Sequence, residues 1–109
     1  MAEEVYRFGK VSPEIPQIIT DGRKAISTAG TRETLVAVST PAKGVLITAV
    51  ATNTGQIVVG GVTVVATVST RQGTPLYAGE SVTIPIDDLL KVYLDATIAA
   101  EGVTYTKLV

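Results

Sequence analysis

The chain has 109 residues, of which 46% are hydrophobic and only 17% charged, with a formal net charge of −1 and neither histidine nor cysteine. The missing residue types exclude disulfide bonds, thiolate catalysis and zinc sites built from Cys and His, and the near-neutral charge argues against binding to nucleic acid or to an anionic membrane. We therefore expect one domain whose apolar surplus partly faces other subunits.

β-branched residues dominate the composition. Val, Ile and Thr contribute 16, 9 and 16 residues, and such side chains pack best on a pleated surface. Short apolar runs separated by turn signals predict an all-β protein, a compact antiparallel β-sandwich. The N-terminal sequence is acidic, and no apolar run approaches membrane-spanning length, so we expect a soluble protein made in a cytoplasm.

The first thirty residues differ from the rest and predict an extended N-terminal arm, residues 1–30, ahead of a β-sandwich domain, residues 31–109. Pro13 and Pro16 fix two φ angles and favour extended conformations before them. Thirty extended residues would reach about 100 Å, far enough to contact a neighbouring subunit. The alternatives are a disordered terminus or a strand added to the chain's own sheet. The predicted contact residues of the arm are Val5, Tyr6, Phe8, Ile15, Ile18 and Ile19.

Six apolar runs follow the arm, each bounded by Gly, Pro, Asn or Asp. The first two are apolar on both faces, which indicates strands that are covered on both sides. Gly60-Gly61 predicts a two-residue hairpin or a sharp kink. The predicted strands cover residues 33–39, 45–51, 56–59, 81–86, 91–95 and 102–109.

The connection after Gly60-Gly61 is unusually apolar. Residues 62–68 alternate in a way that fits either a strand or an apolar loop. Because four valines crowd into this segment, we interpret it as a contact with another subunit. The contact residues would be Val62, Val64, Val65 and Val68.

Turn and strand signatures recur in order along the domain, in segments 43–47, 53–60, 73–81, 86–89, 91–94 and 102–105. In this order they resemble small virion structural proteins of tailed bacteriophages, of the head decoration, head fibre or minor capsid type. The resemblance omits the arm and implies a jelly-roll-like β-sandwich that assembles as a homotrimer on the capsid exterior, with the major capsid protein as its partner.

Asp87 and Asp88 form an adjacent acidic pair, and with Asp95 or Glu101 they could bind calcium or act as the acid and base of a glycosidase. No EF-hand pattern is present, so we prefer a structural role, with Asp87 capping one helical turn at residues 87–90. Binding of a cation by Asp87 and Asp88 is kept as an alternative.

Three tyrosines, Tyr77, Tyr93 and Tyr105, could stack on sugar rings, but ring packing in the core is the preferred interpretation. The sequence therefore predicts no catalytic residue, no metal and no cofactor. We expect a phage virion structural protein that stabilises the head by bridging capsid subunits. The alternatives are a tail, fibre or baseplate module that binds a host glycan or receptor, and a small acid-base hydrolase that uses Asp87 and Asp88.

Overall fold

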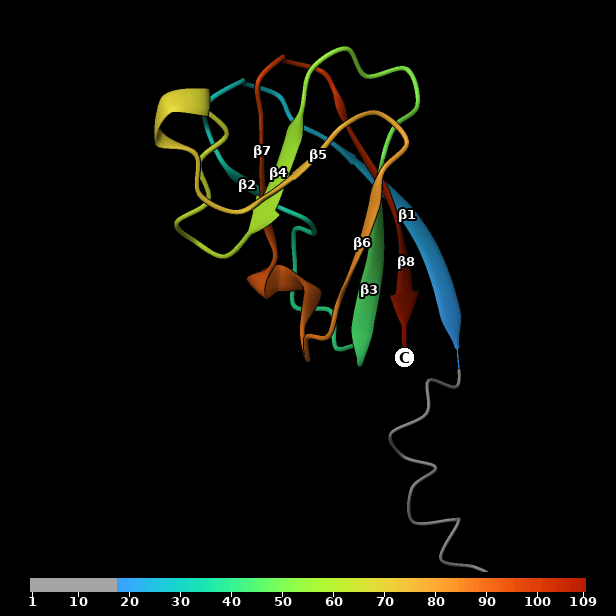
Figure 1. Ribbon diagram of the computed structural model, residues 1–109. Helices are drawn as coiled ribbons and strands as arrows, with labels where there is room; N and C mark the ends of the chain where they lie inside the picture. The colour runs from blue at the N-terminus through green and yellow to red at the C-terminus, as the bar shows by residue number, and fades with distance from the viewer. Residues whose placement is uncertain (1–17) are drawn as a thin grey trace, which may run out of the picture.

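The computed structural model describes residues 18–109 (Figure 1). The predicted arm contacts Val5, Tyr6, Phe8 and Ile15 lie outside the described residues. Two antiparallel four-stranded sheets pack face to face, which confirms the predicted all-β sandwich. No helix in the described part of the chain is long and apolar enough to cross a membrane.

The first sheet holds four strands in the order β1 (Ile19–Ala25), β8 (Gly102–Leu108), β3 (Gly44–Ala49) and β6 (Ser81–Ile84). The second sheet holds β2 (Glu33–Thr34), β7 (Tyr93–Ala96), β4 (Ile57–Gly60) and β5 (Thr74–Leu76). Two short 3₁₀ turns complete the described elements, η2 (Val68–Thr70) and η3 (Leu89–Lys91).

The strand pairing is nested. β1 pairs with β8, β2 with β7, β3 with β6 and β4 with β5, all antiparallel. Only the connection from β4 to β5 stays within one sheet, and every other connection crosses to the other sheet. Ile18 and Val109 exchange two backbone hydrogen bonds of 3.0 and 2.9 Å, so the start of β1 is joined to the last residue of the chain.

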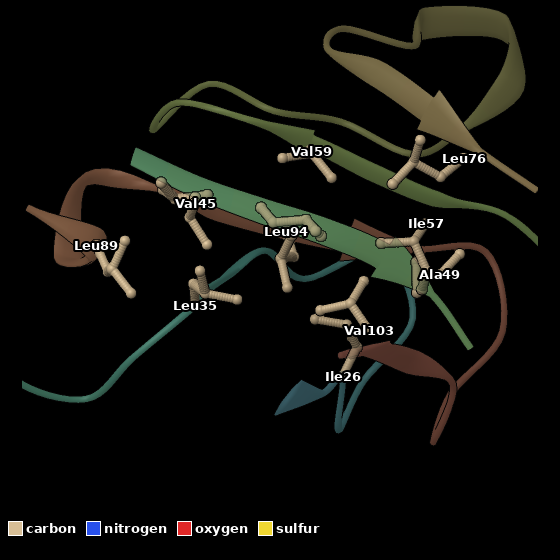
Figure 2. Close-up of a cluster of buried hydrophobic side chains, with 13 residues drawn as sticks. Ile26, Leu35, Val45, Ala49, Ile57, Val59, Leu76, Leu89, Leu94 and Val103 are labelled. Carbon is tan, nitrogen blue, oxygen red and sulfur yellow. The ribbon is translucent and has the colours of Figure 1, made fainter. Parts of the chain in front are cut away.

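The core lies between the two sheets, and Figure 2 shows side chains from both sheets pointing toward one another. In β3 the alternation places Val45, Ile47 and Ala49 in this core, while Leu46 faces solvent. The prediction that this run is covered on both faces is therefore wrong, because the outer side of the first sheet is open among the described residues. Each fully buried Val, Ile or Leu contributes about 1.5–3 kcal/mol to stability.

The strand predicted at residues 33–39 is also wrong over most of its length, since only Glu33 and Thr34 form β2. The Thr34 hydroxyl donates a hydrogen bond of 2.6 Å to the carbonyl of Val36. This local bond competes with the backbone hydrogen bonds that would extend the pairing of β2 with β7. Leu35 enters the core, and the chain then bends. Burial of one large side chain thus outweighs the β propensity of the run.

Residues 61–72, which we name the covering loop, fold over the outer face of the second sheet (Figure 1). Val64 and Ala66 are buried there against Val58, and Tyr93 packs at the side. A bridge between Val65 and Gln72, with hydrogen bonds of 2.9 and 3.0 Å, closes the loop. The segment is therefore a loop and not a regular strand, and Gly60-Gly61 makes a bend instead of a two-residue hairpin.

Part of the predicted arm belongs to the sandwich itself. Ile19–Ala25 forms β1, which adds to the edge of the first sheet along its full length of seven residues. For this segment the structure shows the alternative interpretation, a strand in the chain's own sheet. Ile18 and Ile19 keep exposed side chains at the start of β1.

Gly102 tests the contact between the first and last strands. A β-carbon at Gly102 would collide with the backbone carbonyl of Lys24, and backbone atoms cannot swing aside. We expect Gly102→Ala to lower the free energy of unfolding by about 1–3 kcal/mol, measured by urea denaturation. Gly61→Ala is the matched control, because in the described part of the chain no atom beyond its two neighbours lies within 4 Å of its β-carbon position. Equal stability of the two variants would contradict the close packing of β1 on β8.

Candidate functional site

Asp87 and Asp88 stand at the start of η3 and have different tasks. The cap is Asp88, not Asp87 as predicted, because the turn begins one residue later, at Leu89. Asp88 Oδ1 accepts hydrogen bonds from the backbone N–H of Thr40 at 2.8 Å and of Leu90 at 2.9 Å. Asp87 forms an exposed ion pair with Lys91. A hydrogen bond from the Ser39 hydroxyl, together with these two amides, lowers the pKa of Asp88 below its usual value.

Glu101 holds a turn at the other end of the sandwich. Its carboxylate accepts hydrogen bonds from the backbone N–H of Thr54 at 2.6 Å and of Gly55 at 2.8 Å. The first of these bonds is the main cause that lowers the pKa of Glu101. The structure therefore does not bring Glu101 together with the pair at η3. Across residues 18–109, no group of three or more acidic side chains is placed to hold a metal ion.

Asp95 is buried, with 1% of its surface exposed, on the outer side of β7 beneath the covering loop. Its carboxylate accepts three backbone hydrogen bonds, from Ala66 at 2.9 Å, Ala96 at 2.8 Å and Gly30 at 3.1 Å. Burial of a carboxylate costs free energy unless its oxygens are hydrogen-bonded, and here backbone amides meet that need. Asp95 thus ties two loops to the sheet, a role that the sequence analysis did not predict.

A side-chain contact within the covering loop also holds its conformation. The carbonyl of Ala66 accepts hydrogen bonds from Arg71 Nε at 3.1 Å and Nη2 at 2.8 Å. The backbone of Ala66 is therefore held through its N–H by a buried carboxylate and through its C=O by a guanidinium group. Hydrogen bonds to charged groups are about twice as strong as neutral ones, so this arrangement makes the loop a rigid platform.

The platform presents apolar side chains to solvent. Val62 is 58% exposed and Val68 74% exposed, whereas Val65 is half-buried and Val64 lies in the interior. Of the four predicted contact residues, Val62 and Val68 are thus the ones whose side chains can reach another molecule. A shallow depression of about 480 Å³ adjoins Val62 and is lined also by Asp88, Leu90, Lys91 and Tyr93. The exposed valines and this depression form the candidate contact site.

The tyrosines do not share one surface. Tyr77 is exposed in the turn between β5 and β6, Tyr93 packs beside the covering loop, and Tyr105 lies over Gly22 in the first sheet. A sugar platform needs rings that face the same way, and the described tyrosines lie on separate elements. The preferred interpretation, partial burial against the core, describes Tyr93 and Tyr105.

Asp95→Asn tests the anchoring of the covering loop. The amide group would present a donor where the carboxylate now accepts, and a buried N–H would lose its partner. We expect a loss of about 1–3 kcal/mol in the free energy of unfolding, measured by urea denaturation. Asp87→Asn is the control, since the Asp87 carboxylate is exposed and, among the described residues, bonds only to the side chain of Lys91. A loss of similar size in both variants would argue against this role of Asp95.

Glu101 predicts a pH dependence. Because its folded-state pKa is lowered, the charged carboxylate stabilises the fold above its ordinary pKa of 4.5, and this contribution disappears as the pH falls through the lower folded-state value. We therefore expect Glu101→Gln to melt below the parent protein at pH 7 and to approach it in acid. Thermal unfolding followed by circular dichroism from pH 7 to about 3 measures the difference. A difference that stays constant with pH would contradict the assignment.

Comparisons with known proteins leave the geometry as the main guide to function. No protein-family model matches the chain, and neither the curated proteins nor the solved structures gave a match.

Proposed function

We propose that this chain is a non-enzymatic structural protein of a bacteriophage virion, a head decoration protein that binds the capsid exterior as a homotrimer and bridges neighbouring subunits of the major capsid protein. The observation that carries the proposal is the covering loop, a rigidly anchored segment with exposed valines. The resemblance of the turn and strand signatures supplies the virion context.

The acidic side chains considered for catalysis make contacts within the fold. Asp88, Asp95 and Glu101 each accept hydrogen bonds from the backbone, and Asp87 pairs with Lys91. A general acid or base needs a carboxyl group that is free to meet a substrate. The arrangement of these side chains supports a structural role over the hydrolase alternative.

The energetics of the platform favour contact with protein. Val62 and Val68 lie on a loop whose conformation is set before any partner arrives, so binding would cost little loop entropy. Burial of an exposed Val contributes up to about 1.5–3 kcal/mol. In a trimer three such patches act together, and linked weak contacts add up to firm attachment.

The jelly-roll detail of the fold is part of the same proposal. The strands pair from the outside of the chain inward, β1 with β8, β2 with β7, β3 with β6 and β4 with β5. This nested pairing results when one long antiparallel ribbon folds into two sheets. Jelly rolls are eight-stranded double sheets that occur in viral capsid proteins. Because one fold serves many functions, this agreement supports the proposal only together with the surface.

The double variant Val62→Asp/Val68→Asp tests the function. We expect the parent protein to co-sediment with phage heads that were assembled without it from major capsid protein, and the variant to bind at least tenfold more weakly, because charges would enter an apolar contact. Ile98→Asp is the control, since Ile98 is 42% exposed in the turn between β7 and β8.

Two outcomes would contradict the proposal. Binding of the isolated protein to host cells, with none to heads, would favour the tail or fibre module. Equal binding by the parent protein and the double variant would show that the covering loop is not the contact surface.

A further inference from the structure

Strand β1 is the longest open edge among the described strands. The two sheets have edges at β1 and β6 and at β2 and β5. β2 has only two residues, β5 contains Pro75, and Pro85 follows β6, and all three features discourage further pairing. β1 runs for seven residues without a proline, and no described strand lies on its free side. An edge of this kind is a template for another strand.

The register shows which backbone groups the edge offers. Ile18 and Val109 exchange both backbone hydrogen bonds. In an antiparallel pair, each residue that bonds to the partner strand is followed by one whose N–H and C=O point away from that strand. From residue 18 onward, the even-numbered residues therefore bond to β8. The residues whose backbone groups face the open edge are Ile19, Asp21, Arg23 and Ala25.

We propose that β1 is a self-association surface on which a second copy of this chain adds its own β1, antiparallel, about a two-fold axis at Gly22. The two first sheets then become one continuous sheet. In this register Asp21 lies opposite Arg23 of the second copy, and Arg23 opposite its Asp21. Directly opposite residues point to the same face, so both pairs of opposite charges attract. All four residues with outward backbone groups find partners.

The charges also select this register. With the axis at Asp21, two aspartates would face each other, and with the axis at Arg23, two arginines would do so. Opposed like charges are destabilising, so both slipped registers are disfavoured. Neither Asp21 nor Arg23 has an ion-pair partner within residues 18–109, and both are exposed.

The neighbouring residues fit a close approach. Gly22 would face its own counterpart at the axis, and it has no side chain because the Tyr105 ring occupies the position of a β-carbon. An inward-pointing lysine often blocks an edge, but here Lys24 is bound to Glu33 of its own chain at 2.7 Å. The charges of Asp21 and Arg23 therefore direct the pairing of two β1 strands, and the charge of Lys24 does not prevent it.

The contact is separate from the proposed function. In Figure 1, β1 and the covering loop lie on opposite sides of the sandwich, so two-fold pairing leaves Val62 and Val68 free. Pairing through β1 would link one trimer to the next or join two monomers, and it requires no capsid. A protein that fails to bind heads could therefore still pair through β1. A protein that fails to pair through β1 could still bind heads.

Charge reversal tests the pairing. We use the Val62→Asp/Val68→Asp background, chosen to disable contacts of the covering loop, and measure mass by sedimentation equilibrium. The background protein is expected to pair through β1, as dimers of single chains or as hexamers where it also forms the proposed trimer. Asp21→Arg or Arg23→Asp alone should raise the dissociation constant at least tenfold, because like charges then face each other, and combining the two reversals should restore it. A background protein that stays a monomer or a trimer, or equal masses for all variants, would overturn the proposal.

Disulfide trapping tests the register independently of the charges. Opposed residues in a hydrogen-bonded antiparallel pair have α-carbons about 5.5 Å apart, within the range that a disulfide spans. The chain has no cysteine, so Asp21→Cys protein can be mixed with Arg23→Cys protein under mild oxidation. The mixed disulfide should form several times faster than either homodisulfide, since it also keeps one Asp21–Arg23 pair. Equal rates for all three products would contradict an axis at Gly22.

Discussion

The sandwich depends on the pairing of the two ends of the chain. β8, the last strand, lies between β1 and β3 and bonds to both, so the first sheet has no continuous ladder until the C-terminal segment is in place. Gly102 allows this by bringing the backbone of β8 against that of β1. The remaining pairs nest inside the outer one, and each brings together segments closer in sequence. Because most of these contacts are non-local, the fold gains its stability from assembling the whole chain and not from any isolated hairpin.

A second constraint acts on the outer side of the other sheet. Asp95 replaces an apolar side chain in the middle of a strand, and its burial is tolerated because three backbone amides donate to it. The covering loop in turn has one of its buried amides satisfied by that carboxylate. One hydrogen bond thus satisfies a buried group on each side, the amide of Ala66 and the carboxylate of Asp95. The same exchange sets Val62 and Val68 at fixed positions on the surface.

The sequence predicts the regular parts of this molecule well. Strands β3, β4 and β8 are rich in β-branched residues and bounded by turn residues, and each lies within about two residues of its predicted place, as local patterns allow. Segment 33–39 fails because the bend follows from long-range contacts, those of Leu35 with the core and Asp88 with Thr40, which no local pattern encodes. β1 lacks a clear period since Gly22 interrupts it. The role of Asp95 depends on amides 29 and 65 residues away, although an acidic residue within a strand of apolar neighbours is a signal of special bonding.

The two candidate surfaces differ in the kind of information that they carry. Exposed valines gain free energy from burial in many orientations, so the covering loop alone would give attachment without a defined geometry. Backbone hydrogen bonds along β1 define direction and spacing, and the order of Asp21 and Arg23 distinguishes one register from its neighbours. A protein that joins copies into a regular lattice needs both properties. Affinity on one side of the sandwich and register on the other would supply them from a single small domain, without a ligand or a catalytic group.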